Sequence, residues 1–268
     1  MMAATRRRPL PVSIARRAIL IAVLGYLILP MVAMLEFSTR GARGTRNLDA
    51  WVAIGSDPNL IDAIVTSLEI AALTVVGMLL LLVPTMTWTL LRVPRMRRVV
   101  EFLCLLPLAI PAIVLVVGIA PMYRFLNTFL GGSALTLAFV NVILVLPLAY
   151  RAIDGGLRSI DVATLADAGR SLGAGWLRVM GEVIVPNIRG GILSAAVLAV
   201  ALVLGEYTIA SLLNFDTLQV VIALLGKRNA YVSVAVSLAA LIFAFLLVLA
   251  IAYLAPGGRS RAPQVEEE

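Results

Sequence analysis

Six long apolar runs are the feature that most constrains what this chain can fold into. Most are close to the roughly 20 residues that an α-helix needs to cross the hydrocarbon core of a bilayer, and the second is long enough to start outside the membrane or to tilt. The predicted spans are Ala18–Leu35, Ile61–Leu91, Val99–Ala120, Ala134–Tyr150, Ile188–Leu212 and Ala230–Leu254. Of the 268 residues, 61% are hydrophobic and 14% are charged, whereas about a quarter of a soluble domain is charged. The sequence therefore predicts an all-α polytopic membrane protein with about six transmembrane helices.

The basic residues are spread unevenly over the segments between these runs. If the N-terminus is cytoplasmic, sixteen Lys and Arg residues fall on the cytoplasmic side of the membrane and six on the other side. Cytoplasmic loops carry such an excess, so we expect both termini to be cytoplasmic. The expected layout is a cytoplasmic N-terminal segment over 1–17, one transmembrane domain over 18–254 and a cytoplasmic tail over 255–268.

The N-terminal arginines leave a second interpretation of the first run open. Arg6, Arg7, Arg8, Arg16 and Arg17 precede it, as basic residues precede the apolar core of a signal peptide, and Arg16-Arg17 suggests a twin-arginine signal. We expect a retained helix instead. The run is long for a signal core, and no A-x-A cleavage site follows it.

Several classes of function are excluded by residues that the chain lacks. It contains no His, which rules out His-based zinc sites, Ser-His-Asp triads and His proton relays. Its single Cys, Cys104, lies in an apolar run and is expected to be a packed core thiol. No GxxxxGK[ST] phosphate-binding loop is present, since Gly226-Lys227-Arg228 lacks the upstream Gly and the Ser or Thr. We expect neither an enzyme nor a metal or cofactor site, and the positive charge is explained by membrane orientation rather than by nucleic acid.

The largest polar loop, over 151–189, is predicted to hold two short amphipathic helices. Asp161–Leu172 is the first, with Val162, Leu165, Ala168 or Gly169, and Leu172 on one face. Gly173-Ala174-Gly175 is expected to break it, because Gly is favoured just past a helix end. Trp176–Ile184 is the second helix, with Trp176, Met180 and Val183 on one stripe, and Pro186 is expected to end it.

The spacing inside this loop resembles that of a known family. Asp167-Ala168-Gly169, three residues, Gly173, nine residues and then Val183-Ile184-Val185-Pro186 is similar to the EAA loop, E-A-A-x3-G-x9-I-x-L-P, of the inner-membrane permeases of binding-protein-dependent ABC importers. Asp167 replaces Glu, Gly169 replaces the second Ala, and two Val residues replace Ile and Leu. Leu172-Gly173-Ala174 with Trp176, Leu106–Pro111 and Gly205-Glu206-Tyr207-Thr208 also resemble family segments. The likeness covers roughly residues 60–254.

The resemblance implies a type I importer permease of the bacterial inner membrane. Such a subunit forms half of a solute pathway with a second, homologous but different, permease chain. Two copies of a cytoplasmic ABC ATPase, which binds ATP-Mg, and an extracytoplasmic solute-binding protein complete the system. The loop would dock on the ATPase through Leu165, Asp167, Ala168, Gly169, Leu172, Gly173, Trp176, Met180 and Pro186, with apolar residues as an anchor and charged ones at the rim. The alternative is an ordinary amphipathic loop lying on membrane lipid.

Polar residues inside the predicted spans are candidates for the solute pathway, because an ionisable group at membrane depth is costly. Glu206 and Tyr207 fall in the fifth span, which lines the pathway in such transporters. The alternative for Glu206 is a structural hydrogen bond or ion pair. Glu69, near the outer end of the second span, and Asn141, a candidate for hydrogen bonding between helices, are the weaker members of this set.

Prolines inside the predicted spans indicate where helices can bend. Pro84, Pro107, Pro111 and Pro147 each remove a backbone hydrogen bond. Of these, the pair Pro107 and Pro111 gives the strongest indication of a bent helix.

The substrate is the least constrained property. The L-G-A form of the loop and the G-E-[FY] segment resemble the permease group for polyamines, ferric iron and sulfate, and Glu206 favours a cation such as a polyamine. Two functions of other classes remain open. One is an ion-coupled secondary carrier that uses Glu69 or Glu206, and the other is a non-transporting membrane scaffold.

Overall fold

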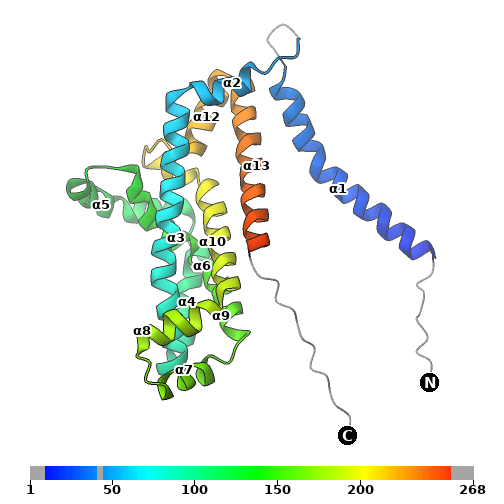
Figure 1. The fold of residues 1–268 in the computed structure, drawn as a ribbon. Helices are drawn as coiled ribbons and strands as arrows, with labels where there is room; N and C mark the ends of the chain where they lie inside the picture. The colour runs from blue at the N-terminus through cyan, green and yellow to red at the C-terminus, as the bar shows by residue number, and fades with distance from the viewer. Residues whose placement is uncertain (1–9, 41–44, 255–268) are drawn as a thin grey trace. The chain divides into compact units, whose positions relative to one another are not determined.

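The computed structural model describes residues 10–40 and 45–254, which fold almost entirely into helices (Figure 1). These residues contain no strand beyond one isolated bridge between Arg40 and Arg46. The long helices are α1 (Leu10–Ser38), α3 (Pro58–Arg92), α5 (Ala112–Leu130), α6 (Leu137–Arg158), α10 (Arg189–Leu204) and α13 (Ala230–Leu254). The shorter ones are α2 (Asp49–Ser56), α4 (Arg97–Leu105), α7 (Val162–Ser171), α8 (Trp176–Arg178), α9 (Val185–Asn187), α11 (Thr208–Leu212) and α12 (Leu218–Arg228). The predicted cytoplasmic tail over 255–268 lies outside the described residues, as do residues 1–9.

Four of the described helices are long and apolar enough to cross a membrane. They are Ile14–Ser38, Pro58–Arg92, Ala134–Arg158 and Ala230–Leu247, and two bent helix pairs raise the number to six if each pair is one span. The predicted all-α, polytopic fold is therefore confirmed. At 1.5 Å per residue, the 35 residues of α3 extend about 52 Å, so this helix is longer than a hydrocarbon core of about 30 Å.

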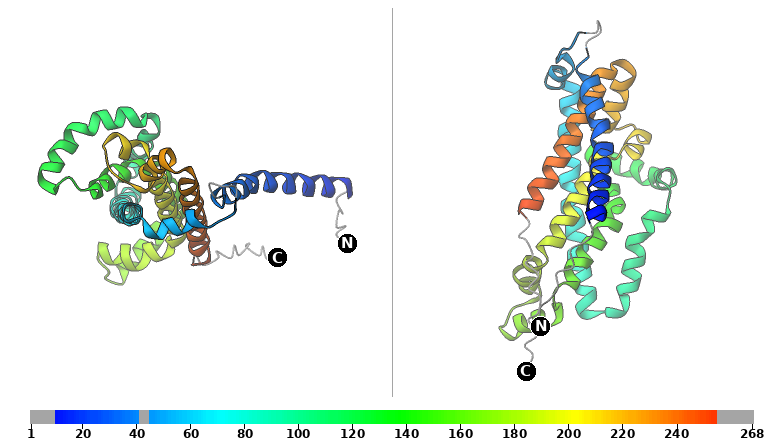
Figure 2. Two further views of the ribbon diagram at one scale, coloured as in Figure 1. Left: turned by 90° about the horizontal axis from the view of Figure 1, so that it is seen from above. Right: turned by 90° about the vertical axis from the view of Figure 1, so that its right-hand side faces the viewer.

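The third predicted span is sharply bent at its proline pair. Pro94–Ala109 and Ala112–Tyr123 meet at 106°. Between them, Ile110 is extended, with φ −102° and ψ 118°, which is the conformation favoured before a proline. The left view of Figure 2 shows α5, in green, projecting from the other helices of the second unit. The bend therefore lies where Pro107 and Pro111 predict it.

The described chain divides into two compact units. The first unit takes the residues up to Pro58 together with Ile222–Ile242, and the second takes Asn59–Val221 with the residues from Phe243 onward. In the first unit, the Phe37 and Tyr231 rings stack with their centroids 5.0 Å apart. The Trp51 indole donates a hydrogen bond of 3.2 Å to the Ser38 hydroxyl.

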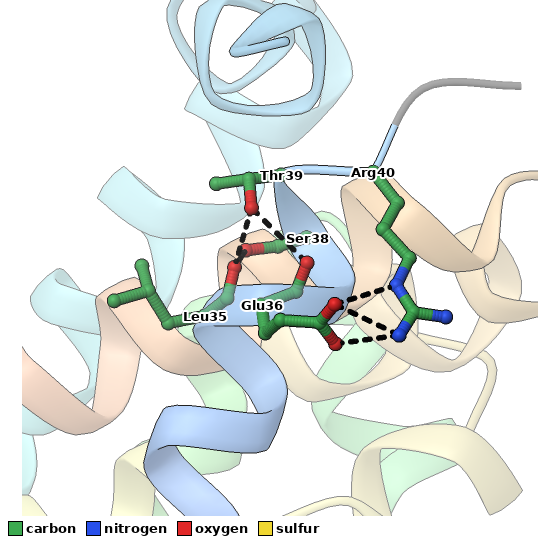
Figure 3. A network of polar contacts seen from close by, with 5 residues as sticks. All are labelled: Leu35, Glu36, Ser38, Thr39 and Arg40. Atoms are coloured by element: carbon green, nitrogen blue, oxygen red, sulfur yellow. Dashed lines mark hydrogen bonds and ion pairs between the residues drawn. The ribbon is translucent and has the colours of Figure 1, made fainter. Parts of the chain in front are cut away.

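Side chains cap the C-terminal end of α1 in the first unit (Figure 3). The hydroxyls of Ser38 and Thr39 both donate to the Leu35 carbonyl oxygen, at 3.0 and 3.1 Å. Arg40 donates two hydrogen bonds of 2.8 Å to the Glu36 carboxylate. The last carbonyls of a helix have no partner within the helix, so the two hydroxyls supply part of what the end of α1 lacks.

The second unit is organised around α6 and α10, which pack side by side (Figure 1). Two glycines allow the helices to approach backbone to backbone. A Cβ on Gly191 would lie 2.8 Å from the Ala152 carbonyl oxygen and 3.1 Å from the Gly156 Cα. Small residues of this kind allow close helix packing in membranes. Ile153 and Ala195, on the same two helices, are fully buried.

Candidate functional site

The polar loop between α6 and α10 folds into two helical segments at one end of the second unit (Figure 1). The first is α7. The second runs without a break from Trp176 to Asn187 through α8, the π-helical segment η4 (Val179–Ile184) and α9, and it meets α10 at 78°. The prediction of two short helices is confirmed. The predicted end of the second helix at Pro186 is wrong, because the helix continues past it and turns at Ile188.

The first turn of α7 is fixed by an N-cap. The Asp161 carboxylate accepts a hydrogen bond of 3.1 Å from the Thr164 backbone N–H and one of 2.7 Å from the Thr164 hydroxyl. These bonds favour the charged carboxylate, so they hold the pKa of Asp161 below its usual range. The predicted start of the first helix at Asp161 therefore corresponds to its cap.

The C-terminal end of α7 closes in a Schellman motif centred on Gly173. The Gly173 N–H donates to the Arg170 carbonyl at 2.9 Å, and the Ala174 N–H donates to the Gly169 carbonyl at 3.1 Å. Gly173 has φ +81°, the left-handed conformation in which a side chain is strained. The predicted break at Gly173 is therefore confirmed.

The two helical segments pack closely through the Gly169 position. Val162, Ala166 and Gly169 form the buried face of α7. A Cβ on Gly169 would lie 3.1 Å from the Val179 Cγ2 and 3.8 Å from the Val183 Cγ2. This contact gives a physical reason for Gly at 169, which is one of the departures from the EAA pattern, because the valines leave little room for an Ala methyl.

The predicted apolar face of α7 is partly wrong. Val162 and Gly169 are buried and Leu165 is half-buried, but Ala168 and Leu172 are exposed, Leu172 to 89%. Leu172 follows the last residue of α7, where the chain turns toward Gly173, so helical periodicity does not determine its direction.

Two leucines, the exposed pair Leu172 and Leu177, lie at the surface of the loop. Leu177 is 74% exposed and, together with Leu172, leaves two large apolar side chains open in a polar segment. Trp176 and Met180, which the sequence places on one stripe with Val183, are less exposed than this pair. Sequence reasoning missed Leu177 because it lies off that stripe. The available signal was a leucine beside Arg178, about 100° around the helix from Trp176 and so outside the stripe.

Charged side chains of the loop bond within their own helices. Arg178 donates to the Glu182 carboxylate at 2.9 Å, and Arg170 lies 3.4 Å from the Asp167 carboxylate. Both carboxylates are exposed. Exposed pairs of this type contribute little to stability, so these charges remain available to a partner.

Glu206 lies at a break in the predicted fifth span and caps a helix there. α10 ends at Leu204, and α11 begins at Thr208, so the expected continuous helix to Leu212 is wrong. The two Glu206 carboxylate oxygens accept hydrogen bonds from the backbone N–H groups of Ile209, at 2.6 Å, and Ala210, at 3.1 Å. These bonds are the structural hydrogen bonding expected as one alternative for Glu206, and a pathway role for Glu206 stays a prediction.

The other side of the break is also satisfied. The Gln219 side chain donates a hydrogen bond of 2.9 Å to the Leu204 carbonyl at the end of α10. The Ser67 hydroxyl, on α3, accepts a bond of 2.8 Å from the Leu218 N–H at the start of α12. Broken helices are tolerated at membrane depth when their free backbone groups find such partners.

The remaining pathway candidates lie in different environments. Asn141 is buried on α6, at 4% exposure, enclosed by this chain's own helices. Tyr207 is exposed beside the break, and Glu69 is exposed on α3. A pathway role for Tyr207, Glu69 and Asn141 stays a prediction.

Comparison with protein families supplies the decisive observation. Residues 83–257 match the family described as the binding-protein-dependent transport system inner membrane component, and this match covers more than half of the chain. The chain belongs to this family. No curated protein matches the chain.

As a binding-protein-dependent transport system inner membrane component, the chain is a membrane permease component of a transporter. Systems of this kind generally work with an ATPase and a solute-binding protein. The loop residues from Asp161 to Ile188, as well as Asn141 and Glu206, fall inside the matched region, whereas Glu69 falls outside it.

Proposed function

We propose that this chain is the permease subunit of an ATP-driven importer and that its loop over 151–189 couples it to a separate ATPase. The chain would form half of the solute pathway and pair with a second, similar permease subunit. The observation that carries the proposal is the compact two-helix loop with Leu172 and Leu177 exposed on its surface, in a chain that belongs to the family.

The architecture of the loop suits a docking element. Exposed apolar side chains surrounded by charged groups are typical of an interface core with a polar rim. The Gly169–Val179 contact and the Gly173 turn hold the two helical segments in one arrangement. A preorganised surface of this kind loses less conformational entropy when it binds.

The energy source would be a partner chain. The sequence has no phosphate-binding loop, so ATP-Mg would bind to two copies of the cytoplasmic ATPase. When those copies close on ATP, the loops would follow them and tilt the helices to which they are joined. An extracytoplasmic binding protein would deliver the solute at the other side of the bacterial inner membrane.

The proposed class of solute is supported only by the resemblance of sequence segments to those of known permeases. Both oxygens of Glu206 are occupied by backbone N–H groups, which weakens the argument that this carboxylate binds a cation. Polyamine, iron and sulfate remain the candidates that the L-G-A and G-E-[FY] segments support. The substrate proposal is therefore a small solute of this group, selected largely by the binding protein.

The test is co-purification of the ATPase with variants of the exposed pair. We expect the double variant Leu172→Asp with Leu177→Asp to lose the ATPase while inserting normally into the membrane, because a buried anchor contributes most of the binding energy of an interface. Leu48→Asp is the control, since Leu48 is also an exposed leucine but lies far from the loop in sequence. It should retain the ATPase as the wild type does.

Two outcomes would contradict the proposal. An unchanged amount of ATPase with the loop double variant would exclude docking through this surface. Solute uptake by the wild-type chain without any nucleotide-binding partner would favour an ion-coupled carrier instead.

A further inference from the structure

One carboxylate at the base of the loop binds two arginines. The Asp154 side chain, on α6, is 17% exposed and lies 2.9 Å from the Arg97 guanidinium and 2.6 Å from that of Arg158. None of these residues belongs to the EAA-like spacing or to the pathway candidates. The cluster is therefore separate from the docking surface and from the pathway candidates.

The Arg97–Asp154 pair joins two separate elements. Arg97 is the first residue of α4, which begins the sharply bent span, and Asp154 lies in the last turns of α6. Only Ser159, Ile160 and the Asp161 cap separate α6 from α7. The pair thus links the start of one predicted span to the base of the loop.

The surroundings of the pair make it more than a surface contact. It borders a cavity of about 320 Å³ whose lining includes Met86, Leu90, Leu157 and Val162. Asp154 is mostly buried and Arg97 is 35% exposed. A partly buried ion pair is screened less by water and salt than an exposed one, so its geometry is more strongly maintained.

Arg158 provides an internal contrast. It binds the same carboxylate, but it lies four residues later on the same helix and is 63% exposed. Both partners of this ion pair therefore lie on α6, and the pair connects no second element. Loss of Arg158 removes a guanidinium from Asp154 without uncoupling any two elements.

The bent span leads from this pair toward the break after α10. Beyond the bend, Tyr123 on α5 is buried, and its hydroxyl donates to the Thr136 carbonyl at 2.7 Å. Its ring lies 6.3 Å from that of Phe215, which follows α11. The α4–α5 segment therefore has a polar attachment at the loop end and an aromatic attachment near the broken helix.

We propose that Arg97 and Asp154 are positioning residues that transmit displacement of the loop to the bent span α4–α5. The inference rests on the proposed coupling function of the loop. α6 carries Asp154 rigidly with the base of the loop, and the ion pair makes the first turn of α4 follow it. The cavity beside the pair leaves space for that movement.

The experiment measures solute transported per ATP hydrolysed by the complete transporter, reconstituted with its native partner subunits. We expect Arg97→Gln to lower this ratio about tenfold, the size of effect that residues along a coupling route produce. The amount of ATPase bound should stay unchanged. Arg158→Gln should behave as wild type, and Arg97→Lys, which keeps the charge, should recover most of the ratio.

A variant in which the two charges are exchanged tests the same contact if Arg97→Gln does not accumulate in the membrane. It combines Arg97→Asp with Asp154→Arg in an Arg158→Gln background, so that no like charges meet. Restored coupling in this variant supports the pair as the transmitting contact. A ratio that stays about tenfold low overturns it.

Three results overturn the inference while leaving the proposed function intact. They are normal coupling in Arg97→Gln, an equal loss in Arg158→Gln, and loss of ATPase binding in Arg97→Gln. The proposed function itself fails in a different measurement, namely if the wild-type chain binds no ATPase and transports without ATP.

Discussion

The left-handed turn at Gly173 allows a prediction in which the whole effect comes from the backbone. At φ +81°, a side chain is strained, but a Cβ at this position would have no heavy atom within 4 Å. The change Gly173→Ala therefore adds no steric clash with neighbouring elements, only conformational strain. That strain is about 1–2 kcal/mol for an L-residue in this region.

The expected consequence is local opening of the loop. A cost of about 1–2 kcal/mol multiplies the open population about 5- to 30-fold. The two amides of the Schellman motif, those of Gly173 and Ala174, report this opening directly because their hydrogen bonds exist only in the closed turn. Hydrogen exchange followed by mass spectrometry should show faster exchange there by that factor.

Gly175→Ala is the matched control. Gly175 lies two residues further on, has an ordinary φ of −71°, and likewise has no heavy atom within 4 Å of the position that an added Cβ would take. It should exchange as wild type does. Equal exchange in the two variants would refute the argument that Gly173 is required by its conformation.

The same position tests the proposed coupling. A bulkier change, Gly173→Leu, should uncouple transport from ATP hydrolysis while leaving membrane insertion intact. Normal uptake in that variant would contradict the docking role of the loop.

Three further perturbations follow from contacts in the second unit. Gly169→Leu should overpack against Val179 and destabilise the loop by about 1–3 kcal/mol, seen as faster amide exchange throughout α7. Glu206→Ala should remove both capping bonds of α11 and cost about 1 kcal/mol, a fall of about 2–4 °C in Tm in detergent; an unchanged Tm would show that the cap contributes nothing. Because the pKa of Asp161 is lowered in the folded chain, the contribution of its cap to stability is fully present above the ordinary value of 3.8 and is lost as the pH falls from that value through the lowered pKa. Exchange at Thr164, corrected for the intrinsic effect of pH, should therefore accelerate in acid, and Asp161→Asn should abolish that pH dependence.

The ends of uniformly apolar helices could be predicted from the sequence because residues within and next to the apolar run determine them. The last predicted span, Ala230–Leu254, coincides with α13, and the bend at Pro111 lies where proline geometry puts it. The break at Gly205 was not predictable in this way. The run there stays apolar, and the helix ends are stabilised by side chains at 206 and 219, the second of which comes from a later element.

The loop shows the same division between local and tertiary causes. The Asp161 cap and the Gly173 turn follow from residue type, and both positions were predicted as helix ends. The buried face was predicted only in part, because Gly169 packs on Val179 from the following helix, and periodicity alone favoured Leu172. Leu177 was missed for the same reason, since its exposure depends on which side of the segment the first helix covers.

The glycine crossing of α6 and α10 has a mechanical consequence for the proposed transporter. The two helices that enter and leave the loop touch at Gly156 and Gly191, so the loop has a narrow neck. In the proposed transporter, displacement of the tip of the loop would pivot at this contact and rotate α6 and α10 against each other. A larger side chain at either glycine would hold α6 and α10 apart at this contact. Displacement of the loop would then no longer rotate the two helices.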